Sequence, residues 1–101
     1  MMIVLFRSQL TDAAGDDYAT MAAEMLARAR TMPGFVDFKS FRADDGERLS
    51  VIWWDNAETL RAWADDARHR VAQRLGREKW YKSFRLEVTE VARSYGFERP
   101  M

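Results

Sequence analysis

The residues with the clearest chemical potential lie in one segment, 63–81, which contains His69, the only histidine of the 101-residue chain. Histidine is the side chain best suited to proton transfer near neutral pH and to ligation of a haem iron or another metal. The chain has no cysteine, so no thiolate competes for these roles. If the protein holds a cofactor through a nitrogen ligand, His69 must supply it.

His69 stands between Arg68 and Arg70, and this setting allows two interpretations. In the first, His69 is a haem ligand or a general base, because repulsion from the arginines lowers its pKa and favours the neutral imidazole. The same arginines could pair with haem propionates, since a guanidinium offers a two-pronged fit to a carboxylate. In the second, His69 is an ordinary solvent-facing residue on an arginine-rich helix.

Further candidates in the same segment each have a structural alternative. Trp63 is expected to line a pocket rather than only to pack in the core, because on a helical wheel it lies beside the apolar stripe of its helix. Trp80 and Tyr81 either pack against the edge of the fold or contact a phenolic substrate. Arg77 is either a contact for an anion or phenolate or a surface charge.

Composition argues against several classes of function. Lysine plus arginine and aspartate plus glutamate both total 16, so we expect neither a nucleic acid nor an anionic membrane as partner. No apolar run approaches the length of about 20 residues that spans a membrane, and we expect a cytoplasmic protein. One histidine and scattered acids do not make a non-haem metal centre. Fingerprints of flavin and nicotinamide sites are absent.

Hydrophobic periodicity predicts the order strand, helix, strand, strand, helix, strand. Asp55 and Glu58 resemble a capping box at the start of the second helix, and Asp65-Asp66 could divide that helix in two. A helical turn over 78–82 should lead into the last strand. This order is the ferredoxin-like βαββαβ plan of an α+β protein. The strands are expected at 2–9, 35–42, 49–54 and 84–93, and the helices at 16–31 and from 55 to about 71.

The predicted sheet has more apolar surface than its own helices can cover. Two helices cover only one face of a four-stranded sheet, yet the first and third strands carry large apolar residues on both faces, including Trp53 and Trp54 side by side. A second copy of the same sheet would bury both open faces symmetrically. We therefore predict a homodimer, which a monomer mass at micromolar concentration by light scattering would contradict.

Four features span nearly the whole chain: Met32-Pro33-Gly34-Phe35 after the first helix, Trp53-Trp54-Asp55 before the second, the segment 63–73, and Gly76-Arg77 followed by Trp80-Tyr81. In their order and spacing the chain resembles the antibiotic biosynthesis monooxygenase superfamily of dimeric α+β barrels. The resemblance implies a single domain over residues 1–101 and a ligand cleft between the sheet and the helices. Within the superfamily the chain is most similar to the small bacterial haem-degrading monooxygenase-like proteins.

The resemblance implies one of two reactions with dioxygen. The first is haem degradation, with Trp63 beside the haem and His69 as the iron ligand; the chemistry of the guanidinium group adds Arg68 and Arg77 to the expected cofactor site. The second is cofactor-free oxidation of a small phenol, quinol or anthrone, with His69 as base and Trp63 and Tyr81 shaping the pocket. The alternative is a non-catalytic dimeric barrel that binds a small aromatic or haem as carrier or sensor.

One type of haem-degrading member differs from this chain at two places. The staphylococcal type carries an asparagine on its first strand, where this chain reads Leu5-Phe6-Arg7-Ser8-Gln9. Its tryptophan and histidine also stand further apart than Trp63 and His69. The resemblance therefore implies the fold more directly than it implies that mechanism.

Overall fold

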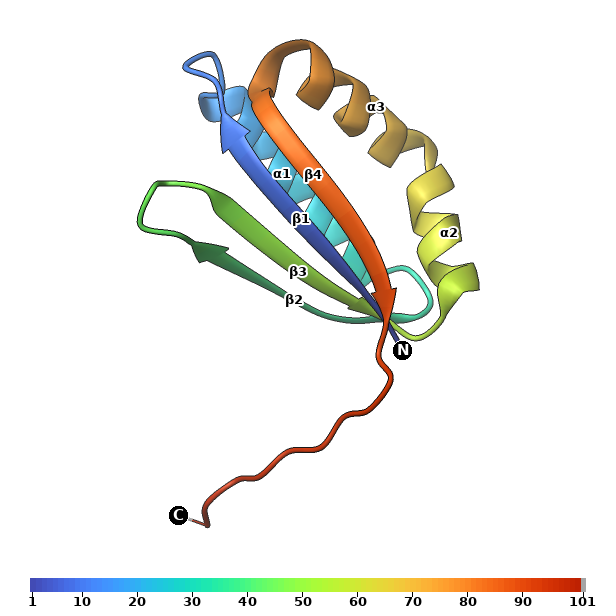
Figure 1. Cartoon of the computed structure of the whole chain (residues 1–101). Helices are drawn as coiled ribbons and strands as arrows, with labels where there is room; N and C mark the ends of the chain where they lie inside the picture. The colour runs from blue at the N-terminus through green and yellow to red at the C-terminus, as the bar shows by residue number, and fades with distance from the viewer. Residues whose placement is uncertain (101) are drawn as a thin grey trace.

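A computed structural model describes residues 1–100 and, for Ala67, the backbone alone; it shows a four-stranded antiparallel sheet accompanied by helices (Figure 1). The strand order is β2-β3-β1-β4. The α+β, ferredoxin-like arrangement predicted from the sequence is confirmed. The elements are β1 (Met2–Leu10), α1 (Asp16–Arg30), β2 (Phe35–Arg42), β3 (Arg48–Trp54), α2 (Ala57–Asp65), α3 (Ala67–Leu75), a π-helical turn η1 (Gly76–Trp80) and β4 (Tyr81–Glu90).

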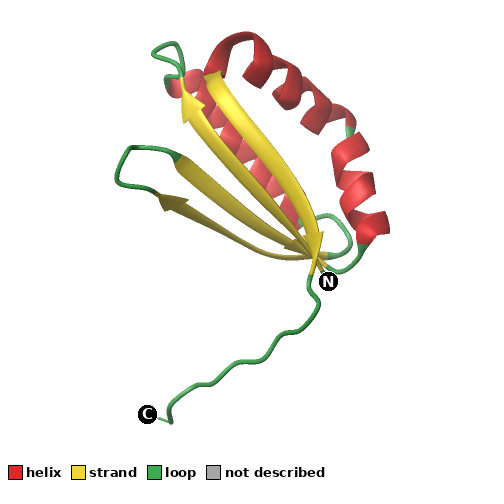
Figure 2. Ribbon diagram, viewed as in Figure 1, coloured by secondary structure: helices red, strands yellow, loops and turns green. Residues whose placement is uncertain are grey.

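The core lies between one face of the sheet and the helices. Figure 2 shows α1 behind the sheet, with α2 and α3 following each other along the side of β4. Val4 of β1 and Trp54 of β3 meet Ala29 of α1 and Trp63 of α2 in one buried cluster. Because side chains alternate along a strand, the odd-numbered residues of β1 lie on the other face. No described element of the chain covers that face.

Two caps place the second half of the fold. The cap of α2 is Asn56, whose side chain accepts a hydrogen bond from the Thr59 N–H at 2.9 Å. The prediction of Asp55 as this cap was wrong by one residue, because the Asp55 N–H instead donates to the Gly34 carbonyl at 2.8 Å. The predicted division at Asp65-Asp66 is confirmed, since the Asp66 side chain accepts from two N–H groups at the start of α3.

The turn before β4 differs from the prediction, which began the last strand at residue 84. The strand begins at Tyr81, directly after η1, and pairs with Leu10 of β1. Gly76 permits this close packing, because a Cβ atom there would lie 2.6 Å from Cε2 of Tyr81. A side chain at that position would therefore push the Tyr81 ring away.

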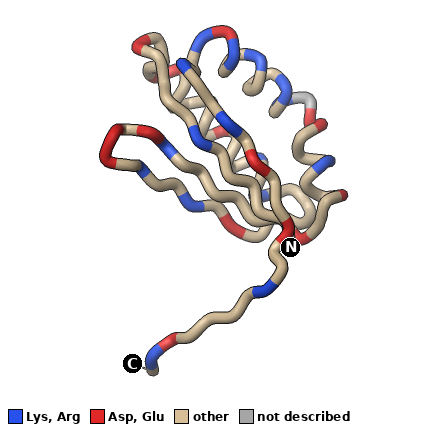
Figure 3. Tube along the Cα trace, viewed as in Figure 1, with Lys and Arg blue, Asp and Glu red and all other residues tan. Residues whose placement is uncertain are grey.

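The chain leaves the domain after β4. The Val91 N–H donates to the Met1 carbonyl at 2.9 Å, and the following residues run outward as an extended tail (Figure 1). Figure 3 shows lysine and arginine interspersed with aspartate and glutamate over most of the fold. Within residues 1–100, no helix is long and apolar enough to cross a membrane.

Candidate active site

A cavity of about 670 Å³ lies between the helix-facing side of the sheet and the helices. Its volume is within the range of about 300–1,000 Å³ that is typical of small-molecule sites. Most of its wall is aliphatic or aromatic, and among the described residues no aspartate or glutamate lines it. An apolar, aromatic ligand is therefore the chemistry that this space fits best.

Four rings form a continuous series at one end of the cavity, which we call the histidine end. Phe35 meets Trp54 edge-on, with ring centroids 5.7 Å apart. Trp54 lies 6.1 Å from Trp63, and Trp63 stacks on His69 at 4.1 Å with an angle of 14° between the planes. Trp54 is fully buried, and the imidazole is thus held flat on a rigid aromatic support.

The hydrogen bonds of His69 define its tautomer. Nδ1 lies 3.0 Å from the Trp63 carbonyl oxygen and 3.4 Å from the Gln73 amide nitrogen. The carbonyl contact is the shorter one and a carbonyl oxygen can only accept, so the proton is assigned to Nδ1. Nε2 then keeps its lone pair and is the atom able to take a proton or bind a metal. The Asp66 cap reinforces this placement, because its Oδ1 accepts from the His69 N–H at 3.1 Å.

The pKa of His69 is lowered as predicted, but the cause is not the one predicted. Burial lowers the pKa of His69 below its ordinary value of 6.5, while the Trp63 carbonyl and the Asp66 carboxylate oppose the shift. The neighbouring arginines do not produce it. Arg68 turns to Glu24 at 2.8 Å and Arg70 to Asp65 at 3.1 Å. His69 is therefore mainly the neutral imidazole at pH 7.

The opposite end of the cavity contains tyrosines and an arginine. The ring centroid of Tyr81 lies 5.3 Å from that of Phe6 and 6.0 Å from that of Tyr18. The Arg48 guanidinium lies 5.7 Å from the centre of the Tyr18 ring. Burial, assisted by Tyr18, raises the pKa of Tyr81 well above its ordinary value of 10. Tyr81 is therefore a neutral phenol that can donate a hydrogen bond.

The length of β3 separates the two ends. Trp54 and Arg48 are its last and first residues, and both line the cavity. At about 3.3 Å per strand residue, six steps correspond to about 20 Å. The cavity can thus contact the two ends of an elongated ligand with different chemistry.

Most of the residues singled out in the sequence are brought together by the fold. His69, Trp63, Tyr81 and Arg77 all line the cavity, and the Arg77 guanidinium lies 5.7 Å from the centre of the Phe84 ring. Arg68 does not line it. Two of these residues, His69 and Trp63, touch each other directly.

Two cavity residues escaped the sequence analysis. Tyr18 was one of several apolar residues at helical spacing in α1, and Arg48 lay just outside the predicted third strand. Trp80 also lines the cavity, and it is 4% exposed with its Nε1 donating to Asp17 at 3.1 Å, so both alternatives for this residue stay open. The sequence did offer one sign of Arg48, which directly precedes the predicted strand 49–54 that ends in two tryptophans.

Metal-ligating side chains are sparse. Over residues 1–100, no three histidine, cysteine, aspartate or glutamate side chains gather in a group that could hold a metal ion. A haem iron already has four nitrogen ligands from the porphyrin, so it needs only one protein ligand, and His69 is the only imidazole that could provide it.

Comparison with known proteins places the chain in a family. Residues 1–75 match the profile of the antibiotic biosynthesis monooxygenase family. The uncharacterized protein YqjZ of Bacillus subtilis is 32% identical over 81 residues, which cover 80% of this chain and 71% of YqjZ.

Two solved structures show the same fold at low sequence identity. SnoaB, a cofactor-independent oxygenase from Streptomyces nogalater, has a TM-score of 0.75 at 14% identity and covers 92% of this chain and 94% of its own. Rv0793 from Mycobacterium tuberculosis has a TM-score of 0.80 at 12% identity, over 94% and 98% of the two chains. The family match and the fold agree: the chain belongs to the antibiotic biosynthesis monooxygenase family.

Proposed function

We propose that the protein is a monooxygenase that uses dioxygen on a phenol, quinol or anthrone held in the cavity, without a cofactor. Family membership supports the monooxygenase class. The observation that carries the rest is the arrangement of His69, whose Nδ1 faces the Trp63 carbonyl and whose Nε2 has no hydrogen-bond partner among the described residues. A neutral, partly buried imidazole at an aromatic wall is a suitable base for a phenolic proton.

The reaction begins with transfer of the phenolic proton to Nε2 of His69. The phenolate is a better electron donor than the phenol, so it can reduce dioxygen directly. The resulting phenoxyl radical and superoxide then combine at a ring carbon, which forms a carbon–oxygen bond. Protonation gives a hydroperoxide, and loss of water from it leaves a quinone. For a simple phenol the balance is C₆H₆O + O₂ → C₆H₄O₂ + H₂O. The substrate supplies all four electrons, so the step needs no external reductant.

The other cavity residues position the substrate in this scheme. The flat surface of Trp63 holds the imidazole in place, so that Nε2 meets the substrate in a fixed direction. Tyr81 remains a neutral phenol because burial raises its pKa, and it can donate to a carbonyl oxygen of the substrate or product. Apolar side chains make up most of the wall around the phenolate, and three of them on β4, Phe84, Leu86 and Val88, are 42–54% exposed.

The test is oxygen uptake with anthrone and with a hydroquinone, comparing the wild type with His69→Phe. Phenylalanine keeps a ring stacked on Trp63 but has no nitrogen. Loss of a general base typically costs a factor of about 10²–10⁴ in rate, and we expect a fall in that range. Arg70→Gln is the matched control, because Arg70 neighbours His69 but pairs with Asp65.

Two outcomes would contradict the proposal. An equal rate in His69→Phe would remove His69 from the chemistry. Binding of the same aromatics without any uptake of oxygen by the wild type would make the protein a binding module that acts as carrier or sensor.

Haem degradation is the second candidate, and the same free nitrogen favours it. Iron ligation requires a neutral imidazole with an available lone pair, which His69 Nε2 provides. Arg77 lines the cavity and could hold a propionate, whereas Arg68 is engaged by Glu24. When bound, reduced haem would supply the activation of dioxygen.

A haem titration separates the two candidates. A saturable Soret band that is lost in His69→Phe, and that decays with ascorbate in the presence of catalase, would assign the haem reaction. A band that is unchanged in His69→Phe would mean that haem only adheres to the apolar cavity. No band at all would leave the cofactor-free reaction.

The predicted homodimer belongs to the same proposal. The face of the sheet opposite the helices carries the half-buried Leu5 of β1 and Trp53 of β3, and Phe41 of β2, which is 51% exposed. Exposed apolar patches of this kind mark interaction sites, and a symmetric second sheet would complement it. Light scattering at micromolar concentration tests this prediction, and a monomer mass would contradict it.

A further inference from the structure

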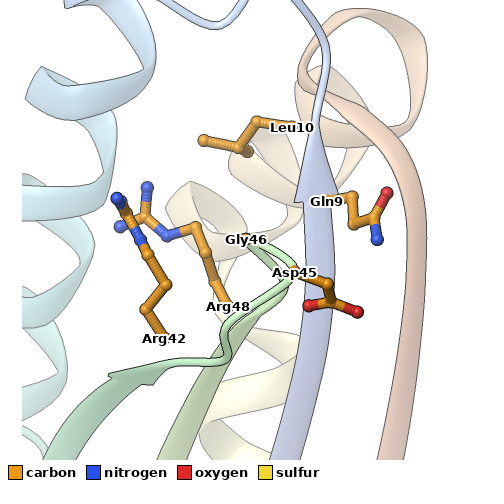
Figure 4. Close-up of a pocket in the computed structure, with 6 residues that line it drawn as sticks. All are labelled: Gln9, Leu10, Arg42, Asp45, Gly46 and Arg48. Carbon is orange, nitrogen blue, oxygen red and sulfur yellow. The ribbon is translucent and has the colours of Figure 1, made fainter.

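Two arginines face each other across the β2–β3 hairpin at the end of the cavity distant from His69. Arg42 and Arg48 are direct cross-strand partners. Figure 4 shows both side chains extending from the hairpin in the same direction, toward α1, while Asp45 projects away from them. Like charges placed directly opposite each other destabilise a sheet, so this pairing calls for an explanation.

Nearby acids do not neutralise the pair. The Glu47 carboxylate accepts from Arg7 Nε at 3.0 Å, and an Asp45 oxygen accepts from the Glu47 N–H at 2.9 Å. Within residues 1–100, neither Arg42 nor Arg48 forms an ion pair. The two guanidinium groups therefore lack an ion-pair partner among the described residues, and Asp45 is the one acid that lines the recess beside them.

Arg48 connects this charge to the aromatic cavity. A surface recess of about 360 Å³ is lined by the two arginines together with Gln9 and Leu10 of β1 and Asp45 and Gly46 of the hairpin turn (Figure 4). Arg48 lines both this recess and the larger cavity, where Tyr18 and Tyr81 lie beside it. An anion bound by the arginines would thus lie next to the aromatic cavity.

We propose that Arg42 and Arg48 bind the carboxylate of an aromatic acid whose ring system occupies the cavity. Guanidinium groups bind carboxylates through paired, charge-assisted hydrogen bonds. The arginines lie at the opposite end of β3 from the tryptophans that support His69, so the ligand is elongated, with its acid distant from the reacting ring. This inference rests on the proposed aromatic cavity, but it does not require that the ligand be oxidised.

The test is equilibrium binding of anthraquinone-2-carboxylate and of its neutral match, anthraquinone-2-carboxamide, by fluorescence quenching of the tryptophans. The wild type should bind the carboxylate more tightly by roughly tenfold or more, as expected for charge-assisted bonds. Arg42→Gln and Arg48→Gln should each lose most of this preference. The control Arg61→Gln, on the exposed surface of α2, should keep it.

Thermal unfolding of the same variants separates a binding role from a structural one. If the pair is kept for a ligand, removing one arginine relieves repulsion, so the melting temperature should stay constant or rise while carboxylate binding weakens. A lower melting temperature with an intact carboxylate preference would overturn the inference.

A further experiment is needed to tell which class of aromatic acid binds, because a porphyrin also carries carboxylates on an aromatic ring system. Metal-free protoporphyrin IX competing with the anthraquinone acid in an arginine-dependent way would assign a porphyrin acid to the pair. Failure to compete would assign a smaller aromatic acid. Equal binding of carboxylate and carboxamide would overturn the inference but leave the aromatic cavity standing. No binding of either compound would contradict both proposals.

Discussion

The two ends of the cavity are built on opposite physical principles. The histidine end consists of stacked rings, with Trp54 fully buried and His69 fixed by a backbone carbonyl. The other end has Tyr18 and Tyr81 near Arg48, and this arginine and its cross-strand partner Arg42 form no ion pair within residues 1–100. Burial at the first end keeps a base neutral, and charge at the second end selects a ligand. The contrast suggests that one end carries most of the stability and the chemistry, and the other the specificity.

Trp54→Ala should have the largest effect on folding. Replacing a fully buried aromatic by alanine typically costs about 3–5 kcal/mol, because it removes apolar contact and leaves a cavity. Trp63 would also lose its support. Denaturant unfolding measures the change, with Tyr18→Ala at the partly exposed end as comparison. A larger loss in Tyr18→Ala would reverse the proposed division between the two ends.

Gly76→Ala should disturb the tyrosine end without altering the histidine end. The new methyl group would lie 2.6 Å from Tyr81 Cε2, and overpacking of this kind costs about 1–3 kcal/mol. We expect weaker binding of the aromatic ligand and an unchanged pKa of His69. Gly15→Ala is the control, because a Cβ there meets no atom within 4 Å. Equal effects of both substitutions would argue against a special role of the Gly76 contact.

Asp66→Ala should loosen the histidine end specifically. This carboxylate caps α3 and accepts two hydrogen bonds from Arg28, at 2.8 and 3.0 Å. We expect a lower melting temperature and a lower oxygenation rate. Asp65→Ala removes the adjacent carboxylate, which makes only an exposed pair with Arg70. If Asp65→Ala had the same effect on the rate, the cap would not position His69.

The smallest predicted effect is a pH dependence of stability from His69. Its pKa is lowered in the folded state, so below about pH 6.5 the unfolded chain binds the proton more readily. The free energy of unfolding should therefore fall as the pH decreases from 6.5 to the folded pKa, and His69→Phe should lack this slope. Denaturant titrations at pH 5.5 and 7.5 would measure it. An identical slope in both proteins would contradict the burial of His69.

The sequence predicted much of the fold because its signals are local. Alternating strands, the Met32-Pro33-Gly34 helix end and the aspartates before α3 act on neighbouring residues. The start of β4 was missed because it depends on Gly76 accepting the Tyr81 ring, a contact that no local pattern encodes. The cap of α2 was misplaced because the Asp55 N–H serves the distant Gly34 carbonyl.

The candidate site was predicted only in part, because local sequence signals identify residues close together in the chain but not those brought together by folding. His69 and Trp63 stand six positions apart in the chain, so their contact depends on the one break between α2 and α3. The lowered pKa of His69 was anticipated, but its cause was not, since burial can be judged only once the helices are packed. Arg42, Arg48 and Tyr18 come from two strands and a helix, and only the folded chain brings them to one end of the cavity.

The most direct test of the account is the ¹⁵N NMR spectrum of the single imidazole as a function of pH. Because His69 is the only histidine, its signals need no assignment by mutation. We predict a protonated Nδ1, an unprotonated Nε2 and a pKa below 6.5. A proton on Nε2, or a pKa at or above 6.5, would contradict the claim that His69 is a neutral base with its free nitrogen at the cavity.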